Sequence, residues 1–209
     1  MKINTTLGLL ASTILLWVQQ TSAASCQGEL KVTTQLDMDK ARSCKTYNGN
    51  IVVDNTGVGS LTLNGVELLE GDLIVTSNDA LQSFSMPKLQ GVNGELKFAN
   101  NKILGSLDMR ELYAVRSLEV SVHPALNELK FPKGLTEAEK ITITDTTVTK
   151  VDGLKMNSAR DIYISNNIYL KTFALPNVTT LNNVLISANS PTLQVDVSLY
   201  ICFYMFFFY

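Results

Sequence analysis

Between residues 51 and 190 the chain repeats one pattern of apolar and polar positions about every 22 residues. Each repeat opens with two apolar residues separated by one outward position, the alternation of a strand with one buried face. The opening residues of the seven repeats are Ile51, Leu73, Leu96, Leu118, Ile141, Ile162 and Val184. The apolar residues two positions later are Val53, Val75, Phe98, Val120, Ile143, Ile164 and Ile186. Because a coil of this length cannot bury its apolar face alone, the pattern predicts stacked coils whose strands form one parallel sheet.

A polar column follows each predicted strand, five residues after the opening residue. Four of the seven positions carry asparagine: Asn78, Asn101, Asn167 and Asn189. An inward Asn can bond the backbone groups of a bend with its own amide, so we predict a structural role for this column. Thr56, His123 and Thr146 fill the other positions. His123 could serve as a base or a metal ligand, but its place in this column and the following Pro124 favour a structural substitute.

Further columns predict the far side of each coil. Apolar residues recur eight and eleven positions after the opening residue, at Leu81, Leu104, Leu126 and Leu170 and at Phe84, Leu107, Leu129 and Phe173. Prolines recur fourteen positions after it, at Pro87, Pro132 and Pro176. We expect the apolar columns to fill the core and the prolines to mark the point where the chain turns back.

The two ends of the chain lie outside the repeat. Residues 1–24 have the parts of a secretory signal: a basic Lys2, twelve apolar residues from Leu7 to Val18, and small residues at Ala23 and Ala24. A membrane anchor is the alternative, but a spanning helix needs about 20 apolar residues. We therefore divide the chain into a signal peptide (1–24), an N-terminal cap (25–50), the repeats (51–197) and an apolar tail (198–209).

Export changes the interpretation of the three cysteines, because disulfides persist in oxidising compartments. Cys26 and Cys44 are 18 residues apart and follow the expected cleavage site, so they form the natural pair. Such a link is worth about 3 kcal/mol. Cys202 is left over, and the absence of a Cys-x-x-Cys pair together with a single histidine argues against a metal site.

Charge and composition narrow the function further. The 17 basic and 19 acidic residues are scattered and give a net charge of −2, so no clustered basic face for nucleic acid is expected. Trp17 lies in the signal, and seven aromatic residues lie among the last ten: Tyr200, Phe203, Tyr204, Phe206, Phe207, Phe208 and Tyr209. The part predicted to fold is therefore poor in aromatic residues and relies on Leu, Ile and Val for its core.

The segment from Cys26 to Cys44, leading into residues 45–53, resembles the N-terminal cap of fungal GPI-anchored cell-wall organisation proteins, which include the sporulation-specific cell-wall proteins. The blocks Gly71–Asn78 and Leu175–Leu181 are similar to the repeats of that family, and the resemblance covers about residues 26–197. It implies a mainly β fold: a right-handed parallel β-solenoid like the receptor L-domain and leucine-rich repeats. It also implies a short helix at about 35–43, clamped to the first coil by the second cysteine.

The tail departs from the family pattern. Members of the family continue through further coils, a Ser-rich stalk and a GPI signal, whereas here the repeat pattern stops after Val197 and no small-residue site precedes the apolar tail. We expect this tail to be translated non-coding sequence from a retained intron or a frameshift. The alternatives are a degenerate GPI signal and a hydrophobic cap over the last coil.

The outward positions of the predicted strands argue against catalysis. Glycoside hydrolysis needs two carboxylates about 5 to 9.5 Å apart, which here means acidic residues at one outward position of adjacent coils. One outward column reads Val52, Ile74, Lys97, Glu119, Thr142, Tyr163 and Leu185, and the other reads Asp54, Thr76, Ala99, Ser121, Thr144, Ser165 and Ser187. Neither column stacks carboxylates, and no nucleophile, phosphate or dinucleotide motif occurs. We expect no catalytic residue, no cofactor and no metal.

The resemblance implies a secreted, non-catalytic protein of the cell wall or cell surface that contributes to wall organisation and integrity, including spore wall assembly. We expect it to act as a scaffold or recognition surface for wall polysaccharide or wall mannoproteins, with membrane attachment only through the GPI anchor of full-length relatives. A receptor-like module that binds a protein or glycan ligand is the alternative, and a β-helix polysaccharide-active enzyme is the third. The sequon Asn177-Val-Thr179 follows a predicted bend and is expected to carry an N-glycan.

Overall fold

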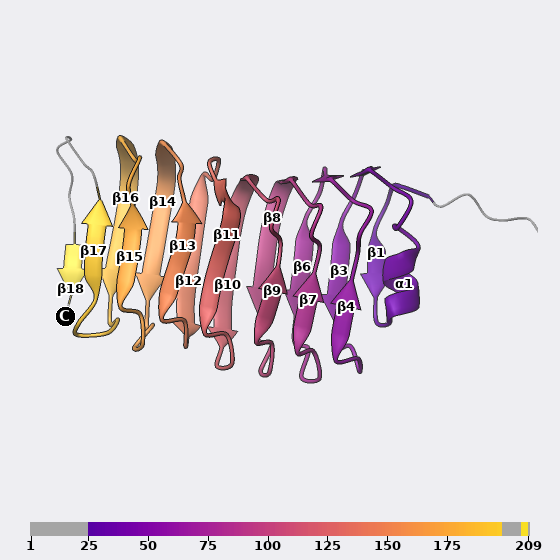
Figure 1. Cartoon of the computed structure of the whole chain (residues 1–209), viewed down its shortest axis with the longest axis horizontal. Helices are drawn as coiled ribbons and strands as arrows, with labels where there is room; N and C mark the ends of the chain where they lie inside the picture. The colour runs from indigo at the N-terminus through magenta and orange to yellow at the C-terminus, as the bar shows by residue number, and fades with distance from the viewer. Residues whose placement is uncertain (1–24, 198–205, 209) are drawn as a thin grey trace, which may run out of the picture.

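Parallel strands stacked along one axis dominate the computed structural model, which describes residues 25–197 and 206–208 (Figure 1). The main sheet contains eleven of the described strands, and nine of them follow one another in sequence order along the axis. These are β1 (Leu30–Val32), β3 (Ile51–Asp54), β6 (Leu73–Thr76), β8 (Gly91–Ala99), β10 (Ala114–His123), β12 (Lys140–Thr146), β14 (Ser158–Ser165), β16 (Thr180–Ser187) and β18 (Phe206–Phe208). The mainly β solenoid with coils of about 22 residues is therefore confirmed.

The register of the main sheet follows the predicted columns. Each opening residue pairs with the opening residue of the next coil, as in Ile51 with Leu73 and Leu118 with Ile141. The cap adds one more strand, because Leu30 of β1 pairs with Ile51. The inward apolar residues of both columns are almost completely buried, apart from the half-buried Val184. Alternation with a period of two thus places one apolar stripe of every strand in the core.

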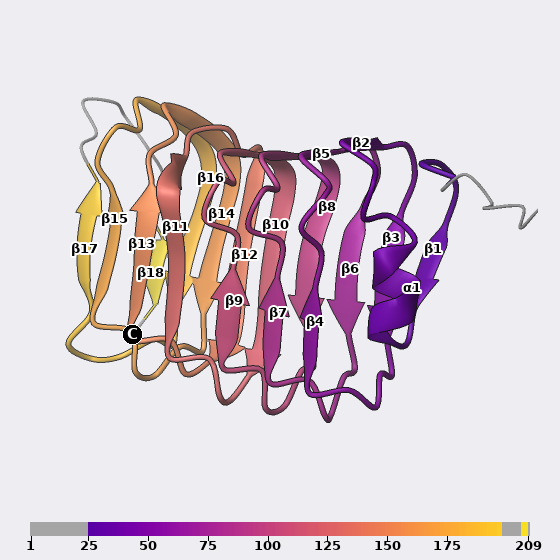
Figure 2. The same ribbon diagram turned by 45° about the vertical axis from the view of Figure 1, so that its right-hand side comes forward.

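A second, shorter ladder lies at the edge where the chain enters the main sheet. It joins β2 (Thr46–Tyr47), β5 (Leu68–Leu69) and the first residues of β8 (Figure 2). Because β8 and β10 run through this edge without interruption, the corner and the main sheet form one continuous surface in the middle of the molecule.

The far side of the solenoid is divided into two sheets. One contains β4 (Ser60–Thr62), β7 (Ser83–Ser85) and β9 (Ser106–Asp108), and the other contains β11 (Glu128–Leu135), β13 (Lys150–Leu154), β15 (Thr172–Leu175) and β17 (Gln194–Val197). Pro87 and Pro176 lie in turns as predicted, but Pro132 lies inside β11. Within the described sheets β11 pairs with β13 only, so the residue without an N–H lies in an edge strand, where proline is tolerated.

The cap closes the N-terminal end of the solenoid. Its helix α1 (Gln35–Asp39) is shorter than the expected 35–43, because residues 40–43 form turns. Thr34 and Asp37 form a capping box at its start. The Gln35 amide bonds both backbone groups of Thr62, donating to the carbonyl at 2.7 Å and accepting from the N–H at 2.9 Å, so the helix continues the ladder that begins at β4.

The expected disulfide joins Cys26 and Cys44, whose Cα atoms are 5.6 Å apart. It connects the start of the cap to the segment that follows α1, next to the buried Met38 and Ala41. The expected signal peptide (1–24) and Cys202 lie outside the described residues.

Three residues of the predicted apolar tail are described. Phe206–Phe208 form β18, which pairs in parallel with β16, Phe206 opposite Leu185. This spacing of 21 residues matches that of the coils, although the side-chain pattern predicts that the register ends at Val197. A run of apolar residues pairs readily with the open edge of a parallel sheet, which accounts for the difference.

Candidate functional site

The asparagine column forms a buried hydrogen-bonded ladder. Asn78 accepts from the Thr56 N–H at 2.9 Å and donates to the Val53 carbonyl at 3.1 Å, both in the preceding coil. Asn101 repeats the pattern, accepting from the Asn78 N–H at 3.1 Å and donating to the Val75 carbonyl at 2.9 Å. Asn167 and Asn189 do the same with the coils before them. These residues therefore hold successive coils together.

One residue before each column position, the backbone adopts a left-handed conformation with φ between 50° and 57°. The seven residues are Asn55, Ser77, Asn100, Val122, Asp145, Asn166 and Ala188. This bend turns the chain out of each main-sheet strand. The sequence contains a signal for it, because four of the seven are Asn or Asp, the side chains that tolerate this region best. Val122 is the outlier, since a β-branched residue is strained at positive φ.

His123 interrupts the ladder between the third and fifth coils. Its side chain is completely buried, and neither ring nitrogen meets hydrogen-bond geometry with a described residue. Burial lowers its pKa, and the nearby backbone of Phe98 and Asn101 opposes that shift only in part. The imidazole therefore occupies the place of an Asn amide without making its two well-formed bonds.

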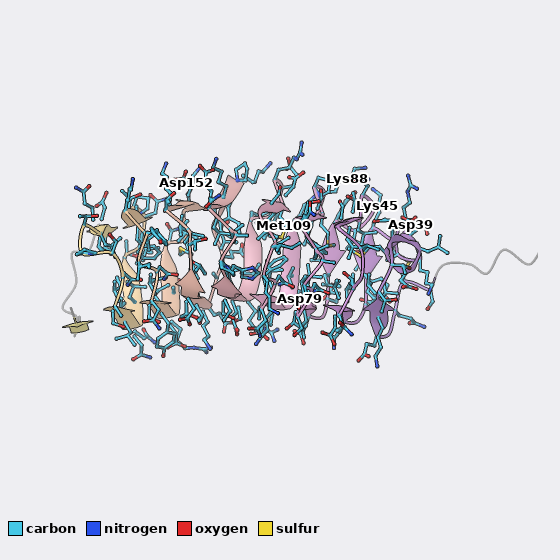
Figure 3. The ribbon with its side chains drawn as sticks, turned by 90° about the horizontal axis from the view of Figure 1, so that it is seen from below. Asp39, Lys45, Asp79, Lys88, Met109 and Asp152 are labelled. Carbon is cyan, nitrogen blue, oxygen red and sulfur yellow. A yellow bond between two sulfur atoms is a disulfide. The ribbon has the colours of Figure 1, made fainter. Side chains whose placement is uncertain are left out.

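The outer face of the main sheet mixes hydroxyl, apolar and charged residues and does not stack carboxylates. Lys97 and Glu119 on adjacent strands form an ion pair at 3.1 Å, and the Ser121 hydroxyl donates to Glu119 at 3.0 Å. Lys140 lies over the Tyr163 ring, 5.9 Å from its centroid. Charged side chains cover both broad sides of the solenoid: in Figure 3 Lys88 and Asp152 lie on one side and Asp79 lies on the other.

At the corner formed by β2, β5 and the first residues of β8, glycines of the first coils stack on one another. A Cβ on Gly49 would lie 2.0 Å from the Gly28 carbonyl oxygen, and a Cβ on Gly71 would lie 2.3 Å from that of Gly49. Gly94 packs against Gly71 in the same way. The column ends there, and the register between β8 and β10 shifts between Val115 and Ser117. The coils after this shift therefore turn the corner with a different backbone.

Two hollows open at the corner from this shift onward. The first, of about 350 Å³, is lined by Val92, Asn93, Ala114, Val115, Arg116, Thr136, Glu137, Ala138, Glu139 and Ser158. The second, of about 380 Å³, is lined by Ala138, Glu139, Ser158, Ala159, Arg160, Thr180 and Asn182. Because they share three residues, they form one depression, here called the corner groove. A smaller hollow of about 160 Å³ precedes it and includes Lys45 and Tyr113.

The charges of the corner groove are balanced. Arg160 forms ion pairs with Glu139 at 3.4 Å and with Asp161 at 3.1 Å. The Asn183 amide and Arg160 hold the pKa of Asp161 below its usual range. Arg116 and Glu137 have exposed side chains with no ion pair in the described part of the chain. Sequence reasoning missed this groove, because its residues lie outside the columns that the sequence pattern aligned on the main-sheet strands.

The expected glycosylation site lies three residues before Thr180, which lines the corner groove. Asn177 is exposed in the turn after β15, where its amide donates to the Lys155 carbonyl at 3.3 Å. The Thr179 hydroxyl donates to the Asn157 carbonyl at 3.2 Å. Glycosylation at Asn177 stays a prediction.

Two searches of the described residues bear on other kinds of site. Residues 25–197 contain no group of three or more His, Cys, Asp or Glu side chains that could hold a metal ion. In the same part of the chain, no helix is both long enough and apolar enough to cross a bilayer.

Comparison with known proteins gives consistent relatives. The chain is 32% identical over 193 residues to "Cell wall protein ecm33" of Schizosaccharomyces pombe, which covers 90% of the chain and 46% of that relative. The homologues of the present chain are fungal cell wall proteins of the Ecm33 family. It is also 26% identical over 168 residues to "Cell surface GPI-anchored protein ECM33" of Candida albicans, covering 79% of the chain and 41% of that relative.

"Sporulation-specific protein 2" of Saccharomyces cerevisiae is 26% identical over 160 residues, covering 74% of the chain and 31% of that relative. The chain thus spans less than half the length of these Ecm33-type relatives. No family model and no solved structure matches it. The relatives' names support a role in the cell wall and a location at the cell wall or cell surface, and they describe wall and surface proteins rather than enzymes.

Proposed function

We propose that this chain contributes to fungal cell wall organisation, including that of the spore wall, as a non-catalytic surface that binds wall polysaccharide or wall mannoproteins. The observation that carries the proposal is the corner groove, a polar depression on a rigid repeat whose relatives are cell wall proteins. Its lining offers hydroxyl, amide, carboxylate and guanidinium groups, which suit hydrogen bonding to a hydroxylated polymer.

The fold supports binding rather than turnover. The outward columns of the main sheet consist mostly of hydroxyl and apolar residues, and their Lys97–Glu119 ion pair places no second carboxylate opposite Glu119. The Asn ladder and the disulfide fix the coils in place, so the surface needs little ordering when it binds. A receptor-like module that binds a protein ligand is the second candidate and is favoured by the same rigid, elongated surface.

Co-sedimentation tests the proposal. The secreted full chain is mixed with insoluble glucan, chitin or mannoprotein-rich wall fractions, pelleted, and assayed for new reducing ends in the supernatant. We expect the protein to pellet with at least one wall fraction and to release no reducing ends. A protein that stays in the supernatant with every wall fraction contradicts the binding role, and released reducing ends contradict the non-catalytic role.

The proposed N-glycan on Asn177 has its own test. Asn177→Gln removes the sequon but leaves the neighbouring coil contacts nearly unchanged, because only one 3.3 Å bond to an exposed turn is altered. We expect the secreted variant to lose the mass of one N-glycan. We expect its free energy of unfolding to stay within about 0.5 kcal/mol of the wild-type value. Intact mass before and after glycosidase treatment measures the loss of the glycan, and Thr179→Ala, which also removes the sequon, is the control. Equal masses for wild type and both variants contradict the proposal.

A further inference from the structure

We infer that the corner groove binds a single uncharged polysaccharide chain lying parallel to the solenoid axis. This inference rests on the proposed function and names the surface, the ligand class and the direction of binding. The groove crosses several coils, running from Val92 in the third coil to Asn182 in the seventh.

The depth of the groove comes from two small residues on its floor. The buried residue three or four positions before the opening residue of each repeat is Tyr47, Leu69, Val92, Val115, Ala138, Ala159 and Leu181 along the coils. Ala138 and Ala159 are 7% and 6% exposed and line the hollows, so the floor is lowered where the larger side chains of the first coils are absent. The register shift at Val115 contributes as well, and bulges of this kind often lie next to binding sites.

The lining favours an uncharged ligand. Its charged residues are Arg116, Arg160, Glu137 and Glu139, two of each sign. The lining therefore carries no net charge that would favour an anionic or a cationic polymer. Its remaining polar groups are hydroxyls and amides, and the unpaired Arg116 and Glu137 can bond to neighbouring hydroxyls of a sugar without breaking an internal ion pair.

The repeat sets the direction. Ser158 pairs with Thr180 across adjacent strands, and Ala114 pairs with Glu137, so equivalent positions recur along the axis once per coil. Adjacent parallel strands lie about 4.8 Å apart, a distance comparable to the length of one sugar unit in an extended chain. A chain along the axis therefore meets a new residue of the same column at roughly every sugar, and Glu137, Ser158 and Thr180 offer it polar groups in succession. A chain across the axis meets only one coil.

The experiment uses four variants of the full secreted chain. Ser158→Trp fills the groove at one of the three residues shared by both hollows, and Arg116→Ala removes an exposed charge that has no ion pair among the described residues. The matched controls are Ser106→Trp on the exposed far side and Arg42→Ala on the exposed cap. Binding is measured calorimetrically with β-linked gluco-oligosaccharides and manno-oligosaccharides of graded length, and with polygalacturonate as an anionic polymer. Circular dichroism checks that each variant is folded.

We expect the wild-type affinity for one neutral series to rise with oligosaccharide length until the chain spans the groove. Ser158→Trp and Arg116→Ala are expected to weaken that binding about tenfold or more, and the two controls to leave it unchanged. If folded groove variants bind as tightly as the wild type, the inference is wrong while the proposed wall-binding function stands. A preference for polygalacturonate, or no gain with length, also overturns the inference. If the wild type binds neither neutral series, the polysaccharide part of the proposed function fails together with it.

Discussion

The first three coils and the last four share one main sheet, but they differ at the corner and on the far side of the solenoid. The first coils turn the corner on stacked glycines and carry the sheet β4-β7-β9, whereas the later coils turn it on larger residues and carry the sheet β11-β13-β15-β17. The main-sheet register passes through the boundary from Leu96 to Leu118. A continuous hydrogen-bonded sheet thus allows the other sides of a coil to diverge, and the corner groove opens on the divergent side.

The two far-side sheets also differ in chemistry. The first exposes hydroxyl groups, with the Ser83 hydroxyl donating to Ser60 at 2.8 Å. The second exposes charges in alternating order, with Glu128 opposite Lys150 and Lys130 opposite Asp152 across β11 and β13. The ion pairs themselves form within each strand, between Lys130 and Glu128 and between Lys150 and Asp152. The neighbouring Glu128 raises the pKa of Lys130. Exposed ion pairs of this kind add little to the stability of a fold, so the difference concerns recognition more than stability.

The boundary itself falls where the Asn ladder is interrupted. The ladder is continuous from Thr56 to Asn101 and from Thr146 to Asn189, and His123 stands between these stretches. The strained Val122 precedes it. The comparison therefore predicts that ladder substitutions within either half are damaging, whereas substitutions at the boundary can be improvements.

The largest expected effect comes from cutting the ladder within one half. Asn101→Ala removes an acceptor for the Asn78 N–H and side chain and a donor to the Val75 carbonyl, all buried. We expect the free energy of unfolding to fall by about 3 kcal/mol or more, because buried polar groups are left unpaired. Urea unfolding measures it, and Asn167→Ala in the second half should show a similar loss. A loss below about 1 kcal/mol in both would mean that the ladder is not what joins the coils.

A slightly smaller loss is expected at the glycine corner. The added Cβ of Gly71→Ala would meet the Gly49 carbonyl oxygen at 2.3 Å, so the backbone of two coils must move. We expect about 2 to 3 kcal/mol of destabilisation in urea unfolding. Gly105→Ala is the matched control, because the nearest atom to its Cβ is the Ala125 carbonyl oxygen at 3.5 Å. If both substitutions destabilise the protein equally, the close packing of the corner glycines does not account for the loss at Gly71.

At the boundary, His123→Asn is expected to stabilise the protein by about 1 to 2 kcal/mol at neutral pH, because it restores the missing ladder bonds. The pH dependence adds a second readout. Since burial lowers the His123 pKa, the unfolded chain binds the proton more readily, and the free energy of unfolding falls as pH drops below about 6.5. Thermal unfolding between pH 8 and pH 5 should show this decline in the wild type and a flatter profile in the variant. If the stability of the wild type and of His123→Asn changes with pH in the same way, buried His123 is not the group responsible.

The smallest effect is expected at Val122, the residue that precedes His123. Val122→Asn places a residue that tolerates positive φ at the bend, where the wild-type φ is 56° and the side chain is exposed. We expect stabilisation of up to about 1 kcal/mol, measured by urea unfolding. Asn100→Val, the reverse change at the same position of the preceding coil, should destabilise by a similar amount. If both substitutions have the same sign, backbone strain is not the cause.

The main-sheet strands, the Asn column and the disulfide could be predicted because each depends on residues that recur in register or lie close together in the sequence. The left-handed bend could have been found from the Asn and Asp residues that precede the column. The position of Pro132 inside a strand could not, because it depends on which neighbouring coil fails to pair with β11. The corner groove was missed for a related reason: its residues, such as Arg116 and Ser158, lie outside the columns that the sequence pattern aligned, and their side chains change in size and charge from coil to coil.

The repeat, the buried face of every main-sheet strand and the polar column that links the coils all follow from the order of the residues. A period of two within strands and of about 22 between them is enough to decide which side chains are buried. The division of the far-side sheet and the opening of the corner arise only when the coils pack against one another. Both depend on a register shift between neighbouring coils and on the size of the side chains stacked there, such as Gly94 below the shift and Ala138 above it. These are properties of coils in contact, which no single repeat contains.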